Sequence, residues 1–409
     1  MVNQTASKVP QIRFKGFEGA WEENLLGEKV EFFSGLTYSP RNVQKGVGTL
    51  VLRSSNVKSG EIVDADNVYV DPSVVNTRNV EVGDITVVVR NGSRSLIGKH
   101  AQIKKRMDST VIGAFMTGIR SEVPSFINAL LDTPKFDKEI ANNLGATINQ
   151  ITTGAFKKMM FRFPRETEQE QVGEYFREID SLIGLHQRKH DKLVTLKKAM
   201  LQKMFPQPGA TTPEIRFKGF EGDWVEKKLG ELCEIVGGGT PSTTIKEYWG
   251  GDIDWYSPTE IGEDVYASGS VKKITQLGLE KCSARILPPD RTILFTSRAG
   301  IGDTAILTKE GCTNQGFQSL VLHDGVVPYF IFSMTHLIKN YALKHASGST
   351  FLEVSRKQLG RMEILLPEEN EQQKIGAYFR ALDTLISQHA TQLQKLQQIK
   401  SACLEKMFV

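Results

Sequence analysis

The chain has 409 residues, of which 40% are hydrophobic and 24% charged, and its formal net charge is +4. These values are typical of a soluble globular protein of two to three domains, and so mild a positive charge does not by itself indicate nucleic-acid binding. No apolar run reaches membrane-spanning length, the first residues lack the layout of a signal peptide, and the four cysteines are scattered. We therefore expect a cytoplasmic protein without a disulfide framework.

The first ordered segment of the chain is repeated 203 residues later. PQIRFKGFEGAWEENLLGE at 10–28 returns as PEIRFKGFEGDWVEKKLGE at 213–231, with 14 of 19 positions identical. A second block, residues 164–205, returns at 367–408 with 20 of 42 positions identical and the same offset. Two copies are too few for a solenoid, so we predict two like domains related by pseudo-twofold symmetry.

The segments between these blocks, 29–163 and 232–366, share little identity but predict the same order of elements. In the first, strands are predicted at 48–54, 67–71, 84–90 and 111–116, followed by an amphipathic helix at 125–144. In the second, strands are predicted in DIDWYS, RTILFTS and TAILT, followed by a helix at 328–345. The shared order predicts one mixed α/β (α+β) scaffold that carries two different binding surfaces.

Basic side chains are concentrated in the first of these domains. From Ile85 to Met107 there are six Lys or Arg residues and no Asp or Glu. Such a cluster suits phosphate oxygens, although a solvated strand edge explains it equally well. Arg and Asn have the best shape for bidentate contacts with guanine and adenine edges, and the predicted turns at 52–60 and 88–95 supply both.

The candidate DNA-binding residues come from these turns and from similar places in the second domain. In the first domain they are Arg53, Ser54, Ser55, Asn56, Arg90, Asn91, Ser93, Arg94 and Lys99. In the second domain they are Thr240, Ser242, Thr243, Tyr248, Ser257, Thr259, Thr296, Ser297 and Arg298.

Each half of the chain closes on a predicted long helix, at 164–205 and 367–409. A capping box at Thr167 and Glu170 begins the first helix, Pro206 ends it, and the second copy starts with the same pattern. Apolar residues recur at a spacing close to heptad a and d positions. The residues predicted to pair the helices are Ile179, Leu182, His186, Leu193, Leu196, Met200, Leu382, Leu385, His389, Leu393, Leu396 and Ile399.

Two arrangements of these helices, each ~55 Å long at 1.5 Å per residue, remain open. Each helix could pack on its own globular domain, or the two could pair as a coiled coil. The matched apolar stripes favour pairing. Antiparallel pairing would give a closed, pseudo-twofold object with one globular domain near each end.

Motifs for catalysis and for cofactor binding are missing from the sequence. There is no Walker A motif, no dinucleotide-binding fingerprint, no Cys-x-x-Cys and no His-Glu-x-x-His. His186 and His190 have a spacing that can hold a metal ion, but histidines on a helix face are far more often structural. We therefore expect no catalytic, cofactor-binding or metal-binding residues in this chain.

The whole layout resembles the specificity subunit of type I restriction–modification systems, HsdS. The resemblance is carried by FEGAWEENLLGE and FEGDWVEKKLGE, by GGGTPSTTIKEYWGGDIDWYSPTEI at 237–261, by TSRAGIGDTAIL at 296–307, by TNQGFQSL at 313–320 and by LPEENEQQKIGAYFRALDTLI at 366–386. It covers essentially the whole chain after the first ten residues. The first variable domain departs more, because RNGSRSLIG stands where the second has TSRAGIG.

The resemblance implies two target recognition domains separated by two long antiparallel helices. The expected organisation is a tail and first copy of the repeated segment at 1–28, recognition domain 1 at 29–163, the central helix at 164–205, a linker and second copy at 206–231, recognition domain 2 at 232–366, and the C-terminal helix at 367–409.

The resemblance also implies a non-catalytic role. Each recognition domain would contact one half of an asymmetric bipartite site in double-stranded DNA, and the paired helices would set the spacer and bind two methyltransferase subunits. Those subunits would use S-adenosylmethionine to methylate adenine. Motor-nuclease subunits, joined through the complex, would use ATP and Mg to cut unmodified DNA. This chain would hold no cofactor and would contact no membrane.

Two other functions remain open from the residues alone. A DNA-binding regulator or architectural protein would bind DNA tightly without partner subunits. An enzyme or ligand-binding protein with a cleft between its two domains would need convergent catalytic groups, which the sequence does not offer.

Overall fold

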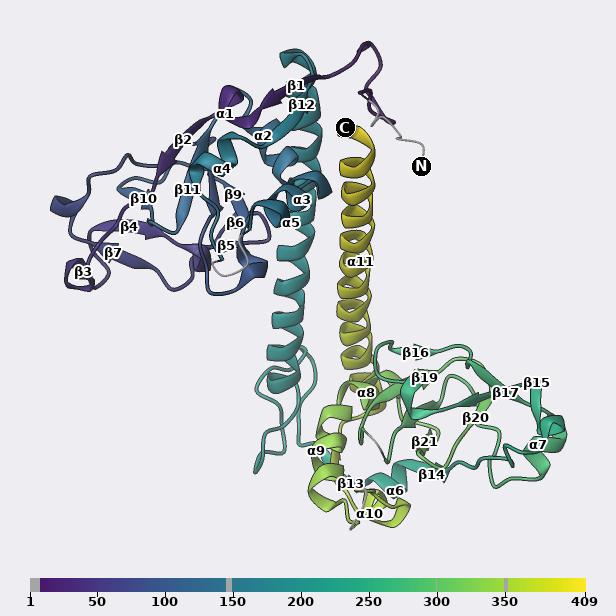
Figure 1. Ribbon diagram of the computed structural model, residues 1–409. Helices are drawn as coiled ribbons and strands as arrows, with labels where there is room; N and C mark the ends of the chain where they lie inside the picture. Colours follow the sequence, from purple (N-terminus) through teal and green to yellow (C-terminus); the bar gives the residue numbers. More distant parts are fainter. Residues whose placement is uncertain (1–7, 145–148, 299, 349–351) are drawn as a thin grey trace. The chain divides into compact units, whose positions relative to one another are not determined.

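The computed structural model forms two compact units (Figure 1). It describes residues 8–144, 149–298, 300–348 and 352–409. Unit 1 contains residues up to Gln187 together with Thr391–Val409, and unit 2 contains Arg188–Ala390. Each unit thus holds one variable domain and one end of each long helix.

The variable domain of unit 1 has two four-stranded sheets. One is antiparallel in the order β2-β11-β8-β9, and the other has the order β10-β4-β7-β3 with a parallel pair, β10·β4. The strands are β2 (Glu31–Ser34), β3 (Val43–Gln44), β4 (Thr49–Leu52), β7 (Val68–Val70), β8 (Ile85–Val88), β9 (His100–Gln102), β10 (Thr110–Ile112) and β11 (Met116–Arg120). The remaining elements are the hairpin β5 (Val57–Lys58) and β6 (Glu61–Ile62), and helices α1 (Leu26–Lys29), α2 (Pro124–Leu131), α3 (Pro134–Asn143) and α4 (Thr153–Lys157).

The variable domain of unit 2 repeats this plan. Its main sheet has the order β14-β21-β18-β19-β16, and a smaller sheet has the order β17-β15-β20 with a parallel pair, β15·β20. The strands are β14 (Cys233–Gly237), β15 (Trp249–Tyr256), β16 (Tyr266–Ala267), β17 (Lys272–Ile274), β18 (Thr292–Phe295), β19 (Thr304–Leu307), β20 (Gly311–Thr313) and β21 (Gln318–Leu322). The helices are α6 (Leu229–Leu232), α7 (Gln276–Glu280), α8 (Pro328–Ser333), α9 (Thr335–His345) and α10 (Arg356–Gly360).

The same topology therefore occurs twice, although the strands share few residues. The order β14-β21-β18-β19 repeats β2-β11-β8-β9, and the parallel pair β15·β20 repeats β4·β10. The prediction of one mixed α/β scaffold carried twice is confirmed.

A two-stranded antiparallel sheet closes each variable domain at the point where the chain enters and leaves it. In unit 1, β1 (Glu22–Leu25) pairs with β12 (Met160–Phe163). In unit 2, β13 (Val225–Lys228) pairs with β22 (Glu363–Leu366). The first and last strands of each domain thus hydrogen-bond to each other.

Both predicted amphipathic helices are divided in the structure. The stretch 125–144 forms α2 and α3, because Pro134 lacks an amide hydrogen and the Thr133 side chain accepts from Phe136 N at 3.3 Å as a new cap. The stretch 328–345 forms α8 and α9, which meet at Met334. The predicted strand 111–116 is also divided, between β10 and β11.

The long helices are α5 (Glu166–Lys203) and α11 (Glu369–Met407). The predicted cap is wrong, because α5 begins one residue before Thr167 and this side chain lies in the first turn. Instead, Gln169 Nε2 donates to Pro164 O at 2.9 Å, and the repeat equivalent Gln372 Nε2 donates to Pro367 O at 3.0 Å.

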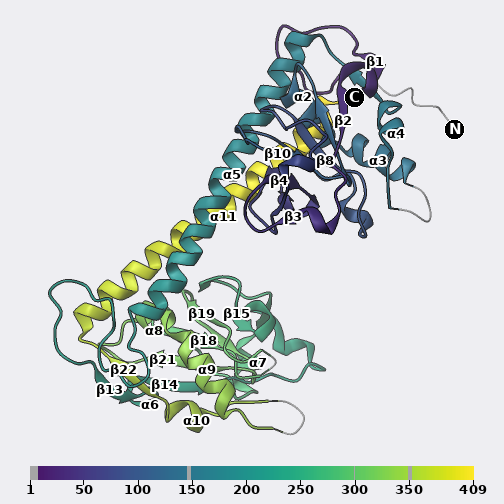
Figure 2. The same cartoon turned by 90° about the vertical axis from the view of Figure 1, so that its left-hand side faces the viewer.

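Within each unit an end of α5 packs antiparallel against an end of α11 (Figure 2). In unit 1 the rings of Phe176 and Phe408 lie 5.8 Å apart, and Asp180 forms an ion pair with Lys400 at 2.6 Å. In unit 2 the rings of Phe205 and Phe379 lie 5.9 Å apart, and Lys197 pairs with Asp383 at 2.5 Å. The antiparallel pairing is confirmed.

The seam between the helices is displaced from part of the predicted stripe. Buried or half-buried residues recur along each helix at alternating intervals of four and three residues. On α5 they are Ile179, Ile183, His186, His190, Leu193, Lys197 and Met200, and on α11 they are Leu382, Ile386, His389, Leu393, Leu396 and Lys400. Four predicted pairing residues lie beside this seam and are exposed by 41–46%: Leu182, Leu196, Leu385 and Ile399. They occupy heptad g positions, next to Ile183, Lys197, Ile386 and Lys400. No helix in the described part of the chain is long and apolar enough to cross a membrane.

Candidate nucleic-acid interface

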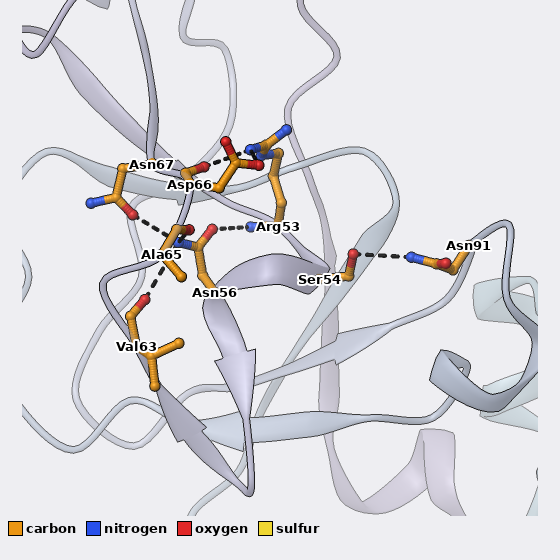
Figure 3. Close-up of polar contacts among 8 residues, drawn as sticks. All are labelled: Arg53, Ser54, Asn56, Val63, Ala65, Asp66, Asn67 and Asn91. Atoms are coloured by element: carbon orange, nitrogen blue, oxygen red, sulfur yellow. Dashed lines mark hydrogen bonds and ion pairs between the residues drawn. The ribbon is translucent and has the colours of Figure 1, made fainter. Parts of the chain in front are cut away.

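A buried asparagine organises the turn that follows β4 (Figure 3). Asn56 Oδ1 accepts from Arg53 N at 2.9 Å, and Asn56 Nδ2 donates to Ala65 O and to Asn67 Oδ1, both at 2.8 Å. The side chain is fully buried. Asn56 therefore joins two segments inside the protein, and its amide is not offered to a base edge as the sequence analysis expected.

Arg53 leaves this turn with its guanidinium held in place. Its Nη2 donates to both the main-chain oxygen and Oδ2 of Asp66, each at 2.5 Å. Asp66 has a φ of +49°, in the left-handed region that Asp tolerates better than most residues. Arg53 is one-third exposed, whereas the Asp66 side chain is 76% exposed. The pair therefore stands at the surface with a fixed orientation.

A hydrogen bond joins this turn to the segment that follows β8. Asn91 Nδ2 donates to Ser54 Oγ at 3.0 Å, and Asn91 Oδ1 accepts from Ser93 N at 2.9 Å. Ser55 is exposed beside them. The structure thus brings both predicted turns of unit 1 together, as the choice of candidates required.

The basic cluster of unit 1 is partly neutralised. Lys104 pairs with Glu61 at 3.1 Å, and Arg106 pairs with Asp108 at 2.7 Å. Glu61 and Asp108 lie outside residues 85–107, the segment in which the sequence has no Asp or Glu. The excess of positive charge is therefore smaller than the composition of the segment indicates.

Three basic candidates remain without a carboxylate partner. Arg90 lies over the ring of Phe115, 5.0 Å from its centroid. Arg94 is exposed and Lys99 half-buried, and neither forms an ion pair with any residue that the structure describes. Such side chains are free to contact phosphate groups.

In unit 2 the turn that follows β15 has the same place in the fold and different chemistry. Ser257 Oγ lies 3.1 Å from Thr259 Oγ1 and donates to Glu260 Oε1 at 3.2 Å. Glu260 Oε2 is buried and has no hydrogen-bond partner among the described residues. The hydroxyl of Ser257 thus stands where unit 1 has Arg53, and the carboxylate of Glu260 stands where unit 1 has Asn56.

Two candidates after β18 are buried, and one of them holds its own loop together. Thr296 Oγ1 donates to Gly300 O at 2.6 Å and accepts from Asp303 N at 2.9 Å. Ser297 beside it is also fully buried. Neither side chain is accessible to DNA in this conformation. Arg298 is half-exposed and pairs with Glu353 at 2.9 Å.

The candidates of the glycine-rich loop are mostly exposed. Thr240 Oγ1 donates to Gln315 Oε1 at 2.5 Å, and Ser242 Oγ lies 2.8 Å from Thr244 Oγ1. Thr243 is exposed, and Tyr248 is half-buried. This loop offers hydroxyl groups without net charge.

Sequence reasoning missed two acidic residues of these faces, Asp66 and Glu260. The search was directed at basic and amide side chains, because those match phosphates and purine edges. A signal for Asp66 was present, since Asp before Asn in a polar segment is typical of a turn. Among the residues described, no group of three or more His, Cys, Asp or Glu side chains is placed to hold a metal ion.

Residues 221–398 match the family described as the type I restriction modification DNA specificity domain. The type I restriction enzyme MjaIX specificity subunit of Methanocaldococcus jannaschii is 39% identical over 191 residues, 46% of this chain and 44% of that protein. The EcoR124I/EcoR124II specificity subunit of Escherichia coli is 30% identical over 178 residues, 42% of this chain and 43% of that protein. The chain thus matches less than half the length of either relative.

A solved structure extends the likeness to both units. The S subunit of a type I restriction–modification system from M. genitalium matches 98% of this chain and 99% of its own length, with a TM-score of 0.67 and 15% identity. At this identity the match concerns the fold alone. Residues 221–398 thus match the type I restriction modification DNA specificity domain family, and both units share the fold of that solved S subunit.

Proposed function

We propose that this chain is the DNA sequence-specificity subunit of a type I restriction–modification complex. Each recognition domain contacts one half of an asymmetric bipartite site in double-stranded DNA, and the subunit thereby directs both adenine methylation and restriction. One observation carries this proposal: a single topology occurs twice, with unlike side chains on equivalent turns. It is a non-catalytic role in the cytoplasm.

The unlike turns favour unlike half-sites. Directly after the parallel strand, unit 1 has the guanidinium of Arg53 and unit 2 has the hydroxyl of Ser257. A guanidinium only donates hydrogen bonds and suits the acceptors of guanine, whereas a hydroxyl both donates and accepts. Unlike side chains in the same structural position therefore favour different bases.

The repeated blocks support two equivalent partner sites. Arg13 forms a two-point ion pair with Glu168, with Nε and Nη2 each 2.7 Å from a carboxylate oxygen. Arg216 forms the same pair with Glu371, at 2.8 Å for both contacts. Both glutamates are almost completely buried. These pairs fix each repeated segment to the first turn of its helix in the same way.

We place these partner sites at exposed apolar pairs on the helices. In unit 1, Leu182 lies two residues after Asp180, and Ile399 lies one residue before Lys400. Because Asp180 and Lys400 form an ion pair between the helices, Leu182 and Ile399 lie at the same level along the helix pair. In an antiparallel coiled coil the g positions of both helices face the same side. An exposed apolar pair of this kind can be covered by a helix of another protein.

Unit 2 carries the same feature at positions 203 residues away. Leu196 and Leu385 lie at the level of the ion pair of Lys197 with Asp383. We therefore assign two methyltransferase subunits to these two surfaces. S-adenosylmethionine, ATP and Mg belong to the partner subunits, and the motor-nuclease subunits join through the assembled complex.

Co-expression with the methyltransferase subunit tests this function. The expected product is a complex of one specificity chain with two methyltransferase subunits that methylates adenine in a bipartite, asymmetric motif. Sequencing of methylated adenine in cells with and without this chain gives the motif. Tight, sequence-specific binding by the isolated chain, with no effect on methylation, would instead identify a stand-alone regulator.

A further inference from the structure

We infer that Arg53 recognises a guanine in the half-site bound by unit 1, and that Asp66 is the positioning residue that orients Arg53. This inference rests on the proposed function and assigns a base to one side chain. The sequence analysis named Arg53 among nine candidates of this domain without separating base contacts from phosphate contacts.

The hydrogen-bonding state of Arg53 shows which groups remain for a ligand. Both contacts to Asp66 use Nη2. The two N–H groups of Nη1 have no acceptor among the described residues, and Nε is buried without a partner. Arg53 therefore requires a ligand with acceptors only. Guanine is the base whose major-groove edge offers two adjacent acceptors, O6 and N7, and arginine is its commonest specific partner.

Charge distinguishes a base from a phosphate at this position. The carboxylate of Asp66 is 76% exposed and cancels the charge of Arg53. A phosphate placed at Arg53 would also lie near this carboxylate and be repelled, whereas a neutral base edge would not. The unpaired side chains of Arg94 and Lys99 suit phosphates better. The same face thus contains one neutralised, fixed arginine and two free cations.

Rigidity supports the same assignment. The buried amide of Asn56 bonds Arg53 N at one side and Ala65 O and Asn67 Oδ1 at the other (Figure 3). It therefore fixes the main chain on both sides of the contact between Arg53 and Asp66. A side chain already ordered loses little conformational entropy when it binds, which favours discrimination between bases.

The first test compares methylation motifs of the full complex with its methyltransferase subunits. Arg53→Ala should relax one position of one half-site, that position should be guanine in the wild-type motif, and the preference should fall about 5- to 150-fold, the range for one mismatched base pair. The other half-site should not change. Arg94→Ala should weaken binding to all sequences alike and reduce the salt dependence.

A matched control separates this effect from the loss of any paired arginine. Arg78 also pairs with a carboxylate, that of Glu31 at 2.9 Å, and it is not among the candidates. Arg78→Ala should leave the motif intact. Thermal unfolding of each variant verifies folding, and Arg53→Gln replaces Arg53→Ala if the latter is unstable.

The positioning role of Asp66 has its own readout. Asp66→Asn should relax the same position as Arg53→Ala, by a smaller factor. The double variant should discriminate no worse than Arg53→Ala alone, because Asp66 acts only through Arg53. Additive losses, or relaxation at another position, would show that Asp66 is merely structural.

An atomic substitution in the DNA completes the test. Replacing the guanine by 7-deazaguanine removes the N7 acceptor, which should weaken binding of the wild-type complex and leave the Arg53→Ala complex unaffected. Equal losses in both complexes, an unchanged motif in Arg53→Ala, or a relaxed base other than guanine would overturn the inference. A wild-type complex that methylates no bipartite motif would instead contradict the proposed function itself.

Discussion

Units 1 and 2 place the same turn after the same parallel strand and fill it with different side chains. In unit 1, Arg53 is fixed by Asp66 and by the buried amide of Asn56. In unit 2, Ser257 donates to Glu260, whose second oxygen is buried without a partner among the described residues. The comparison shows that the sheets preserve the turn, whereas its residues decide which polar groups it carries.

The contacts between each variable domain and the helices differ in a related way. In unit 1, Lys400 contacts Asp180 and Asp132, each at 2.6 Å, and His100 lies 3.4 Å from Asp132. In unit 2, Asp383 accepts from Lys197 and from the hydroxyl of Tyr329 at 2.8 Å. The pair of Lys and Asp on the helices is repeated, but the group that reaches it from the domain is not.

The largest expected effect comes from dividing the chain. A half-chain of residues 1–208 lacks the helix end 391–409 that completes unit 1, but its own residues 188–205 are the repeat equivalent of 391–408. Two copies can therefore complete each other. We expect a homodimer with a palindromic methylation motif made from two copies of the unit 1 half-site, measured by light scattering and methylation sequencing. A monomeric half-chain would mean that the two helix ends are not interchangeable.

Removing the charge of Lys400 tests how far the ion pairs of unit 1 differ from the pair of Lys197 with Asp383 in unit 2. Lys400→Met leaves Asp132 and Asp180 facing each other in a largely buried site, and we expect a loss of about 3 kcal/mol in the free energy of unfolding. Lys197→Met is the matched variant of unit 2. It should cost less, because Asp383 keeps the hydroxyl of Tyr329. Urea unfolding measures both, and equal losses would contradict the distinction.

The exposed apolar pairs can be broken one unit at a time. Leu182→Asp combined with Ile399→Asp should weaken one methyltransferase site by at least about 2 kcal/mol, as for a hot spot at an interface. The complex should then contain one methyltransferase subunit in place of two, as measured by native mass spectrometry. Leu196→Asp with Leu385→Asp should remove the other subunit. Unchanged stoichiometry in both would place the docking surface elsewhere.

The unlike turns predict independent changes of the two half-sites. Ser257→Ala should alter the preference at one position by about 1–3 kcal/mol, since it removes the hydroxyl that stands in the place of Arg53. Only the half-site bound by unit 2 should change. Methylation sequencing decides the outcome, and a change in the half-site that depends on Arg53 would exclude the assignment.

The smallest expected effect is a difference in pH dependence. Burial lowers the pKa of His100, but the carboxylate of Asp132, 3.4 Å from Nε2, outweighs burial, so the pKa is raised. Burial conversely keeps the pKa of His336 in unit 2 below its ordinary value. His100 therefore binds a proton more tightly when folded and adds stability as the pH falls, whereas His336 subtracts it.

Between pH 8 and pH 5.5 the two units should consequently change stability in opposite directions. At lower pH the contribution of Asp132 in unit 1 should also be lost. Burial raises the pKa of this carboxyl, but its contacts with His100 and Lys400 outweigh burial and hold it at about 2. Hydrogen exchange resolved by unit measures the effect. His100→Gln and His336→Gln should each flatten the response of their own unit only.

The repeat made the architecture predictable from the sequence. Some of the predicted helix-pairing residues were wrong because several positions of the seam carry charged side chains. Hydrophobicity selects Leu196 and Ile399 over their neighbours Lys197 and Lys400. The lysines nevertheless face the partner helix, because Asp383 and Asp180 lie opposite and neutralise them. Spacing alone does not separate the two choices, because both repeat every seven residues; the opposite charges across the seam decide.

The candidate site was predictable only as a set of segments. Asn56 and Thr296 were chosen as exposed polar residues of turns, but their hydrogen bonds hold the turns in shape. Partners such as Ala65 and Asp303 lie close in space to residues that the sequence separates by a loop. Which polar groups face outward depends on those loops, and no local pattern gives their path.

The antiparallel sheets β1·β12 and β13·β22 have a consequence for how new specificities arise. Because each variable domain begins and ends on hydrogen-bonded neighbours, the chain enters and leaves it at one place. The repeated blocks flank this place in the sequence. Exchange of a variable domain between two such chains would therefore need only two junctions, both at this place, together with residues that keep the contacts of Asp132 and Tyr329 with the helices.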